Sequence, residues 1–319
     1  MACRRTAVAR AAEQWFFTEA HILEPEITKW KGLRVGESVA TCYPDADAFH
    51  LRVCVDIIIW GFRLDDLLDE FDVNDTLQLR ECCISVCQDP VDFQMEKNLC
   101  KYVQIPMHTS FRFMSRFRET SGTRCTERLI RSFDLILTAM VKEVEDRAKG
   151  CIHDFKSYIA LRRDTVGGKM MLILVEYAAQ IDLPDEVISH PVIMAMEEAV
   201  INHMSWTNYI YSYNKEQSCP DTHNLVTVLM HEKRLDLQGA VDYAGQPCKS
   251  AIQRFEDNRV NLPSWGKEID RQVALYGQGL QNIIVGPLEW YLSSARYCME
   301  DGRTVNRDRV VTLLPKRPL

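Results

Sequence analysis

Four acidic side chains lie close together at Asp65, Asp66, Asp69 and Glu70. In a helix, Asp65 and Asp69 are one turn apart on the same face, so their carboxylates repel each other. A shared hard cation removes this repulsion, and Mg²⁺ binds carboxylate oxygens together with substrate phosphate oxygens. A solvated acidic helix end is the alternative. The apolar run 53–60 before the cluster favours a metal site at the mouth of an apolar pocket.

A second series of oxygen donors occurs at Asn208, Ser212 and Glu216. Steps of four residues place the three side chains within a helical sector of about 80° and along about 12 Å of the axis. An amide, a hydroxyl and a carboxylate supply oxygen ligands of the kind Mg²⁺ accepts. Ile201 and Met204 make the preceding turns of this face apolar. Three such residues also occur by chance at a polar helix end. The series therefore indicates a metal site only in combination with the acidic cluster.

Together, residues 65–69 and 208–216 resemble the aspartate-rich motif and the Asn/Ser/Glu motif of class I terpene synthases, and they begin 143 residues apart (208 minus 65). The resemblance extends from about Trp15 to about Tyr297 and is nearest to basidiomycete-type fungal sesquiterpene synthases. The family usually has Asp directly after the Asn, where this chain has Tyr209. The resemblance implies three Mg²⁺ ions, with Mn²⁺ as a substitute, and the metal ligands Asp65, Asp69, Asn208, Ser212 and Glu216.

The segment 162–168 is similar to the diphosphate-sensing segment of that family. The planar guanidinium of Arg162 suits phosphate oxygens, and the paired glycines at its end predict a helix break. By resemblance, Thr165 is the linker and Val166 the effector at a break that turns a backbone carbonyl toward the forming cation. A helix end with two basic residues is the local alternative.

The C-terminal part of the chain completes the expected site. By resemblance, Lys215, Arg296 and Tyr297 bind the diphosphate with Arg162, while Trp290 lines the cavity and stabilises carbocations through its ring. Core packing is the alternative for Trp290, and Phe93 or Phe113 could extend the wall. The departing diphosphate is the expected final base, so no histidine is assigned that role. The expected catalytic residues are Phe62, Asp65, Arg162, Thr165, Val166 and Trp290.

The elements that must position these residues are helices. Apolar residues recur with helical periodicity, alternating strand patterns are rare, and breaks fall at Gly and Pro. We therefore predict an all-α chain with one domain over 1–319, loose termini at 1–12 and 304–319, and a tail that is loose or forms a short flap. The resemblance implies the class I terpenoid synthase fold, an antiparallel helix bundle around an apolar active-site cavity. Helices are predicted near 7–21, 47–71, 76–88, 91–101, 107–117, 124–147, 151–161, 169–180, 187–216, 222–233, 236–259, 266–281 and 283–299.

Composition excludes several other classes of protein. The 38 basic and 45 acidic residues give a net charge of −7, which argues against a nucleic-acid partner. No apolar run reaches the length of about 18 residues typical of a membrane span. The 12 scattered cysteines predict reduced thiols and a cytoplasmic location. Arg4, Arg5 and Arg10 without a nearby acid are compatible with a transit peptide, but we expect a frayed N-terminus.

These features predict a carbon–oxygen lyase acting on phosphates. The expected enzyme is a Mg²⁺-dependent sesquiterpene synthase that ionises farnesyl diphosphate, cyclises the carbocation and releases diphosphate, acting as a monomer or a homodimer. A synthase using geranyl or geranylgeranyl diphosphate is one alternative. A trans-prenyltransferase is another, although the second Asp-rich cluster it would carry is absent from the sequence. A non-catalytic helical interaction protein that kept the fold is the alternative from another class.

Overall fold

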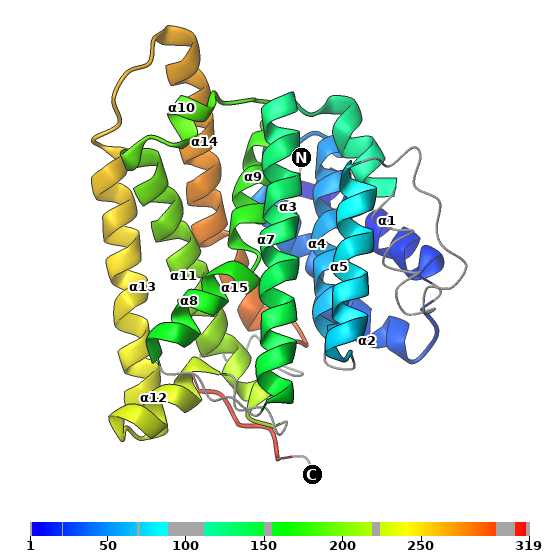
Figure 1. Ribbon diagram of the computed structural model, residues 1–319, viewed down its shortest axis with the longest axis vertical. Coiled ribbons are helices and arrows are strands. Elements are labelled where there is room, and N and C mark those ends of the chain that lie inside the picture. The colour runs from blue at the N-terminus through cyan, green and yellow to red at the C-terminus, as the bar shows by residue number, and fades with distance from the viewer. Residues whose placement is uncertain are drawn as a thin grey trace.

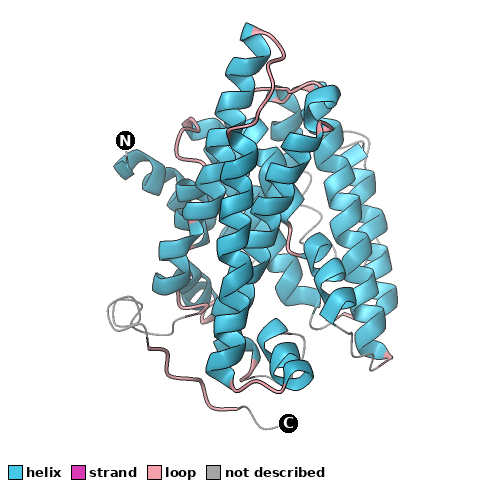
Figure 2. Cartoon of the chain, turned by 90° about the vertical axis from the view of Figure 1, so that its left-hand side faces the viewer, coloured by secondary structure: helices cyan, strands magenta, loops and turns pink. Residues whose placement is uncertain are grey.

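The computed structural model describes residues 2–20, 22–68, 71–88, 112–149, 155–218, 224–297 and 310–316. Over these ranges the chain is built from helices and connecting loops, and it contains no strand (Figure 2). The longer helices run side by side along the long axis of the molecule (Figure 1). The predicted all-α class is therefore confirmed.

Fourteen helices have both ends within the described ranges, and residues 112–120 are also helical. Their bounds are α1 Ala2–Glu19, α2 Glu26–Leu33, α3 Val35–Cys42, α4 Ala48–Leu68, α5 Val73–Gln88, α7 Thr123–Ala148, α8 Phe155–Thr165, α9 Gly168–Ala178, α10 Asp185–Ile188, α11 Pro191–Glu216, α12 Leu225–Lys233, α13 Leu237–Arg259, α14 Lys267–Val285 and α15 Pro287–Ser293.

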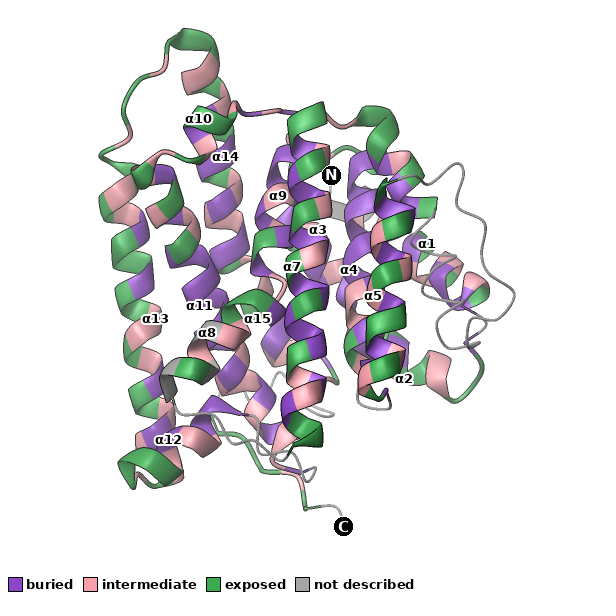
Figure 3. Ribbon diagram, in the orientation of Figure 1, coloured by how far each residue is buried: buried purple, intermediate pink, exposed green. Residues whose placement is uncertain are grey.

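Helix α4 is the most deeply enclosed element that carries expected site residues. Every residue from Val53 to Trp60 is buried, and a helix that is apolar on all sides must be surrounded by protein. The one acid in this run, Asp56, is paired with Arg52 and Arg116, with an N–O distance of 2.9 Å in each pair. Figure 3 shows buried residues on the inward faces of α4, α9 and α11. These three helices form the centre of the bundle.

The predicted helix break after residue 165 is confirmed. Helix α8 ends at Thr165 and α9 begins at Gly168, with Gly167 between them at a φ of 71°. This left-handed conformation favours glycine because it has no Cβ. A Cβ on Gly168 would lie 2.9 Å from Cγ1 of Ile201, so the second glycine lets α9 approach α11 closely. The break is fixed by backbone conformation on one side and by packing on the other.

Several predicted boundaries differ from the structure. The helix expected over 187–216 is divided into α10 and α11, because Pro191 begins a new helix at its first position and His190 caps it by accepting a hydrogen bond from the Val192 N–H. Helices α2 and α3 were not predicted, since each has only 8 residues and too few turns for a clear periodicity. The last predicted helix, 283–299, is replaced by the end of α14 and the short α15. The expected helix 91–101 lies outside the described residues.

The described parts of both ends contact the fold, where loose termini, or a short flap for the tail, were predicted. Helix α1 begins at Ala2, and Ala9 and Ala12 are fully buried where α1 packs against α3 and α4. Near the other end, the Leu314 N–H donates to Asn214 Oδ1 at 2.8 Å, and the Leu314 carbonyl accepts from Gln217 Nε2 at 2.9 Å. The tail thus runs to the end of α11 at the lower edge of Figure 1, as a flap would.

Within the described ranges, none of the helices combines the length and the apolar character required to cross a lipid bilayer.

Candidate active site

A cavity of about 800 Å³ lies inside the bundle, bordered by α3, α4, α7, α8, α9, α11, α14 and α15. Its volume is in the range of small-molecule sites. Twelve of the residues expected from the sequence line it: Phe62, Asp65, Arg162, Thr165, Val166, Asn208, Ser212, Lys215, Glu216, Trp290, Arg296 and Tyr297. The structure therefore brings together residues spread over 236 positions of the chain (297 minus 62, both ends counted).

Three other expected residues remain. Asp69 and Phe93 lie outside the described residues. Phe113 is fully buried and packs edge-on against Trp60, with ring centroids 5.4 Å apart. It belongs to the core behind α4, and its suggested place in the cavity wall is wrong.

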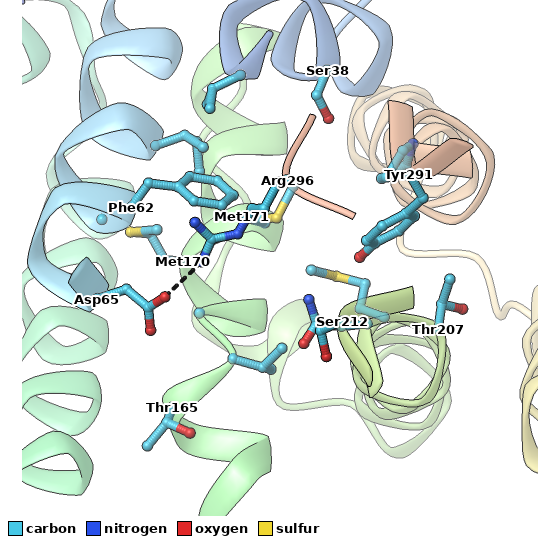
Figure 4. A pocket seen from close by; sticks show the side chains of 18 of the residues that line it. Ser38, Phe62, Asp65, Thr165, Met170, Met171, Thr207, Ser212, Tyr291 and Arg296 are labelled. Carbon is cyan, nitrogen blue, oxygen red and sulfur yellow. Dashed lines mark hydrogen bonds and ion pairs between the residues drawn. The ribbon is translucent and has the colours of Figure 1, made fainter. Parts of the chain in front are cut away.

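The acidic cluster on α4 faces a guanidinium. Arg296 Nη2 lies 2.8 Å from Asp65 Oδ2, and Arg296 Nη1 lies 3.6 Å from Asp66 Oδ1. Figure 4 shows the Asp65–Arg296 bond crossing one side of the cavity, with Ser212 and Tyr291 opposite. Burial alone would lower the pKa of Arg296, but Tyr297 and the two aspartates raise it above its usual value. The cation expected to bind diphosphate and the acids expected to bind metal thus meet directly.

Two of the three oxygen ligands expected on α11, Ser212 and Glu216, share one hydrogen-bond partner. Ser212 Oγ and Glu216 Oε2 both accept hydrogen bonds from Asn224 Nδ2, at 3.3 and 2.8 Å. Because Asn224 Nδ2 reaches both oxygens at once, a single metal ion placed near them could also bind both. The Asn208 amide donates to the Tyr297 hydroxyl at 3.3 Å, so it faces the diphosphate-binding pair. This set of hydroxyl, carboxylate and amide oxygens fits a hard divalent cation.

Clusters of three His, Cys, Asp or Glu side chains suited to a metal do not occur among the described residues. This agrees with the expected ligand set, because Asn208 and Ser212 contribute an amide and a hydroxyl, and Asp69 lies outside the described residues.

The α8–α9 break brings Arg162 and Thr165 to one carboxylate. Thr165 Oγ1 donates to Glu143 Oε1 at 3.0 Å, and Arg162 Nη1 lies 3.5 Å from the same oxygen. The Arg162 guanidinium carbon also lies 5.7 Å from the ring centroid of Tyr209. Burial raises the pKa of Tyr209 to about 12, so the phenol stays neutral beside the cation. Tyr209, which stands where the family usually has Asp, thus packs against the arginine expected to bind diphosphate.

Aromatic side chains around Trp290 form one wall of the cavity. The Trp290 ring lies edge-on to Phe62 at 5.8 Å and to Tyr297 at 5.3 Å between centroids. The indole N–H donates to the Leu33 carbonyl, which fixes the ring plane. The Arg296 guanidinium carbon lies 4.9 Å from the Phe62 centroid. Both aromatic residues expected to stabilise cations are therefore present in the wall and are held by other elements.

Several lining residues were missed by the sequence analysis, among them His203, Thr207 and Tyr291. His203 and Thr207 are in an i, i+4 series with Lys215, next to the series that contains Asn208. That periodicity was a usable signal. Tyr291 had none, because its place depends on how α15 packs. The only sequence signal at Asn224 is that asparagine favours the N-cap position of a helix. The Val226 N–H indeed donates to Asn224 Oδ1 at 2.7 Å.

Comparison with known proteins decides the family. The chain matches the family described as terpene synthase family 2, C-terminal metal binding, over residues 56–254, which is more than half of its length. The chain belongs to this terpene synthase family. Membership confirms the resemblance found in the sequence and implies a divalent metal ion and an isoprenoid diphosphate substrate. The roles of individual residues stay predictions.

The curated relatives of this terpene synthase include fungal enzymes. It is 37% identical to sesquiterpene synthase Agr1 of Cyclocybe aegerita over 315 residues, covering 99% of the chain and 89% of that protein. It is 38% identical to alpha-muurolene synthase of Coprinopsis cinerea, covering 90% of the chain and 68% of that protein.

Among solved structures, germacradien-4-ol synthase from Streptomyces citricolor matches with a TM-score of 0.77 at 18% identity, covering 90% of this chain and 93% of that one. Linalool/nerolidol synthase from Streptomyces clavuligerus, solved with 2-fluorogeranyl diphosphate, matches with a TM-score of 0.78 at 20% identity, covering 92% and 95%. These likenesses confirm the fold.

Proposed function

We propose that this terpene synthase is a Mg²⁺-dependent sesquiterpene synthase that ionises farnesyl diphosphate, cyclises the carbocation and releases diphosphate. One observation carries the proposal: oxygen donors from α4 and α11, and the cations Arg162, Lys215 and Arg296, border one cavity whose wall is aromatic and apolar. The curated relatives named as sesquiterpene synthases support farnesyl diphosphate as the substrate.

The residues divide the work by position. Asp65, Asn208, Ser212 and Glu216 would hold the metal, with Asp69 as a further expected ligand. Bound Mg²⁺ neutralises the substrate diphosphate and makes it a better leaving group. Arg162, Lys215, Arg296 and Tyr297 would donate hydrogen bonds and positive charge to the same group.

Beyond the mouth, the cavity has to protect a cation. Phe62 and Trp290 present π-electrons to it, and Thr165 and Val166 stand at the helix break beside it. Closure around the substrate excludes water that would quench the cation. The proposal includes further predictions: three bound Mg²⁺ ions, Mn²⁺ as a substitute, a monomer or homodimer, and a cytoplasmic location.

The direct test is incubation of the pure protein with farnesyl diphosphate and Mg²⁺, followed by gas chromatography and mass spectrometry. We expect a cyclic sesquiterpene, with geranyl and geranylgeranyl diphosphates turned over more slowly. Consumption of isopentenyl diphosphate would indicate a prenyltransferase instead. If none of the three substrates is converted, and calorimetry detects no Mg²⁺-dependent bisphosphonate binding, the catalytic proposal is wrong.

The metal ligands provide a second test. Asp65→Asn and Asn208→Ala should each reduce turnover by about 100-fold or more, because the first removes the carboxylate charge and the second the amide oxygen that would hold the metal in the transition state. Circular dichroism should show unchanged helical content. Asp242→Asn, on the exposed face of α13, is the matched control and should leave turnover intact. Full activity in both site variants would refute the metal assignment.

A further inference from the structure

One buried histidine faces the cavity without a partner. His203 on α11 lines the cavity and is only 5% exposed. Among the described residues, none forms a hydrogen bond or an ion pair with its ring. The other described histidines differ: His50 bonds to Asp47, His190 caps α11, and His231 is exposed. The His203 side chain therefore borders the cavity with no bond to any other described residue.

The surroundings of His203 keep its imidazole neutral. Burial lowers the pKa of His203 below its usual value. A neutral imidazole has one nitrogen with a free lone pair. The cavity would therefore contain a proton acceptor at neutral pH.

His203 lies on the inner side of the expected metal ligands of α11. Asn208, Ser212 and Glu216 follow it by five, nine and thirteen residues, which places His203 about 8, 13 and 20 Å back along the helix axis. A diphosphate held by the metal ligands and by Arg296 stays at the mouth. Carbons at the inner end of a folded isoprenoid chain would be near His203 and beyond reach of that diphosphate.

Among the lining residues that the structure describes, no other side chain is as well suited to accept a proton in this part of the cavity. Glu143 is engaged by Arg162 and Thr165 at the α8–α9 break. Thr207 offers only a hydroxyl, and burial raises the pKa of Tyr291 far above its usual value. Hydroxyls are weak bases, so they would leave the terminal cation unquenched.

We propose that His203 accepts the proton that ends the cyclisation. The inference rests on the proposed function. A ring nitrogen of His203 forms a bond to the proton on a carbon next to the final cation, and the electrons of that C–H bond become the new C=C double bond. The imidazolium then loses its proton to water when the product leaves. His203 would thus determine which carbon is deprotonated and hence the product.

The test compares the products of wild-type protein, His203→Gln and His203→Asn from farnesyl diphosphate and Mg²⁺. Both amides are polar but lack a basic nitrogen. Because Gln and Asn differ in length, an effect common to both variants does not come from the size of one replacement. Met204→Leu, at the neighbouring cavity position, is the control for contour alone, and His231→Gln is the control for an exposed histidine. Circular dichroism checks that each variant is folded.

We expect the variants to release diphosphate at a rate close to that of wild type, while the share of the main product falls about tenfold. The new products should keep the carbon skeleton but carry the double bond elsewhere, or a hydroxyl from captured water. Met204→Leu should change the ratio of skeletons instead. An unchanged main product in the folded His203 variants would overturn the inference, and so would a pattern like that of Met204→Leu. An inert wild-type protein would refute the proposed function itself.

Discussion

Arg296 is the residue at which the two halves of the site meet. Its side chain bonds to Asp65, and its flat face covers Phe62. A guanidinium can do both because it is planar and carries several fixed donors, whereas an ammonium is a compact point charge. The same cation can therefore balance the acidic cluster before substrate binds and contact the diphosphate afterwards.

The Arg296→Lys variant distinguishes the contribution of the positive charge from that of the planar guanidinium group. We expect Arg296→Lys to lower kcat/KM for farnesyl diphosphate by about 30-fold, because the charge remains while the bidentate donors and the stacking on Phe62 are lost. Steady-state release of diphosphate measures this effect. Arg259→Lys, in an exposed pair with Glu256, should leave kcat/KM unchanged. Equal values for the Arg296 variant and wild type would show that charge alone suffices.

Asn224 joins helix capping to the donor series of α11. Its Oδ1 caps α12 by accepting from the Val226 N–H, while its Nδ2 bonds to Ser212 and Glu216. Asn224→Ser should preserve the cap, because serine is an equally good N-cap residue, but it removes the amide N–H₂.

We therefore expect the Asn224→Ser protein to keep its melting temperature within a few degrees. The Mg²⁺ concentration that gives half of the maximal activity should change about tenfold in either direction. Residues that hydrogen-bond to metal ligands alter metal affinity by a factor of this size. Titration of activity with Mg²⁺ measures the change. Asn224→Asp retains the cap oxygen and adds charge, so a Mg²⁺ requirement identical in all three proteins would exclude this role.

The sequence predicted those site residues that repeat within one helix. Asp65 and the Asn208 series follow an i, i+4 spacing, and that spacing indicated metal binding. Contacts between distant segments were not predicted: Trp290 donates to Leu33, 257 positions away, and no local pattern encodes such a pair. His203 was overlooked because its role depends on which groups fail to reach it, and only packing decides that.

At the scale of elements, the end of α11 holds both the donor series and the C-terminal segment. Asn214 and Gln217 bond to the two backbone groups of Leu314, and between them in sequence stand Lys215 and Glu216. Movement of the segment 310–316 is therefore coupled to the residues expected to bind diphosphate and metal. The sequence predicted the long helices and the Gly167 break well, but this contact is tertiary and had no local signal.

Removal of residues 310–319 should open the site to water. We expect the truncated protein to stay folded and to release a several-fold larger share of linear alcohol, since water reaches the cation before it cyclises. Gas chromatography gives the ratio of alcohol to cyclic product. Gln217→Ala removes one of the two bonds and should give an intermediate ratio. Identical product ratios in all three proteins would mean that the segment plays no part in closure.

At the scale of the whole molecule, a buried polar network ties three helices together on the side away from the mouth. Arg128 of α7 bonds to Glu176 of α9 at 2.7 Å and to Asp185 of α10 at 2.6 Å. Arg128 and Glu176 also bond to the backbone of Leu183, at 3.1 Å each. Arg128 is 9% exposed and Glu176 is 1% exposed. Such a network orients α9, whose first turn follows the helix break at the cavity.

The charge of Glu176 makes this network sensitive to pH. Burial raises the pKa of Glu176 to about 7, although Arg128 opposes the shift. The folded state therefore binds the proton more tightly than the unfolded chain, whose glutamate has its usual pKa of 4.5. The contribution of this group is fully present below that value, and the free energy of unfolding falls as pH rises toward 7.

Arg128→Met should destabilise the protein in a pH-dependent way. Near pH 8 we expect a loss of about 3–5 kcal/mol, because an ionised Glu176 would be left buried without its partner. Without the guanidinium the pKa of Glu176 rises further, so near pH 5 the carboxyl is protonated and the loss is smaller. Urea unfolding followed by circular dichroism at both pH values measures the difference. Arg259→Met, at an exposed ion pair, is the control. An equal loss at both pH values would mean that packing of the Arg128 side chain, and not the charge of Glu176, stabilises the junction of α7, α9 and α10.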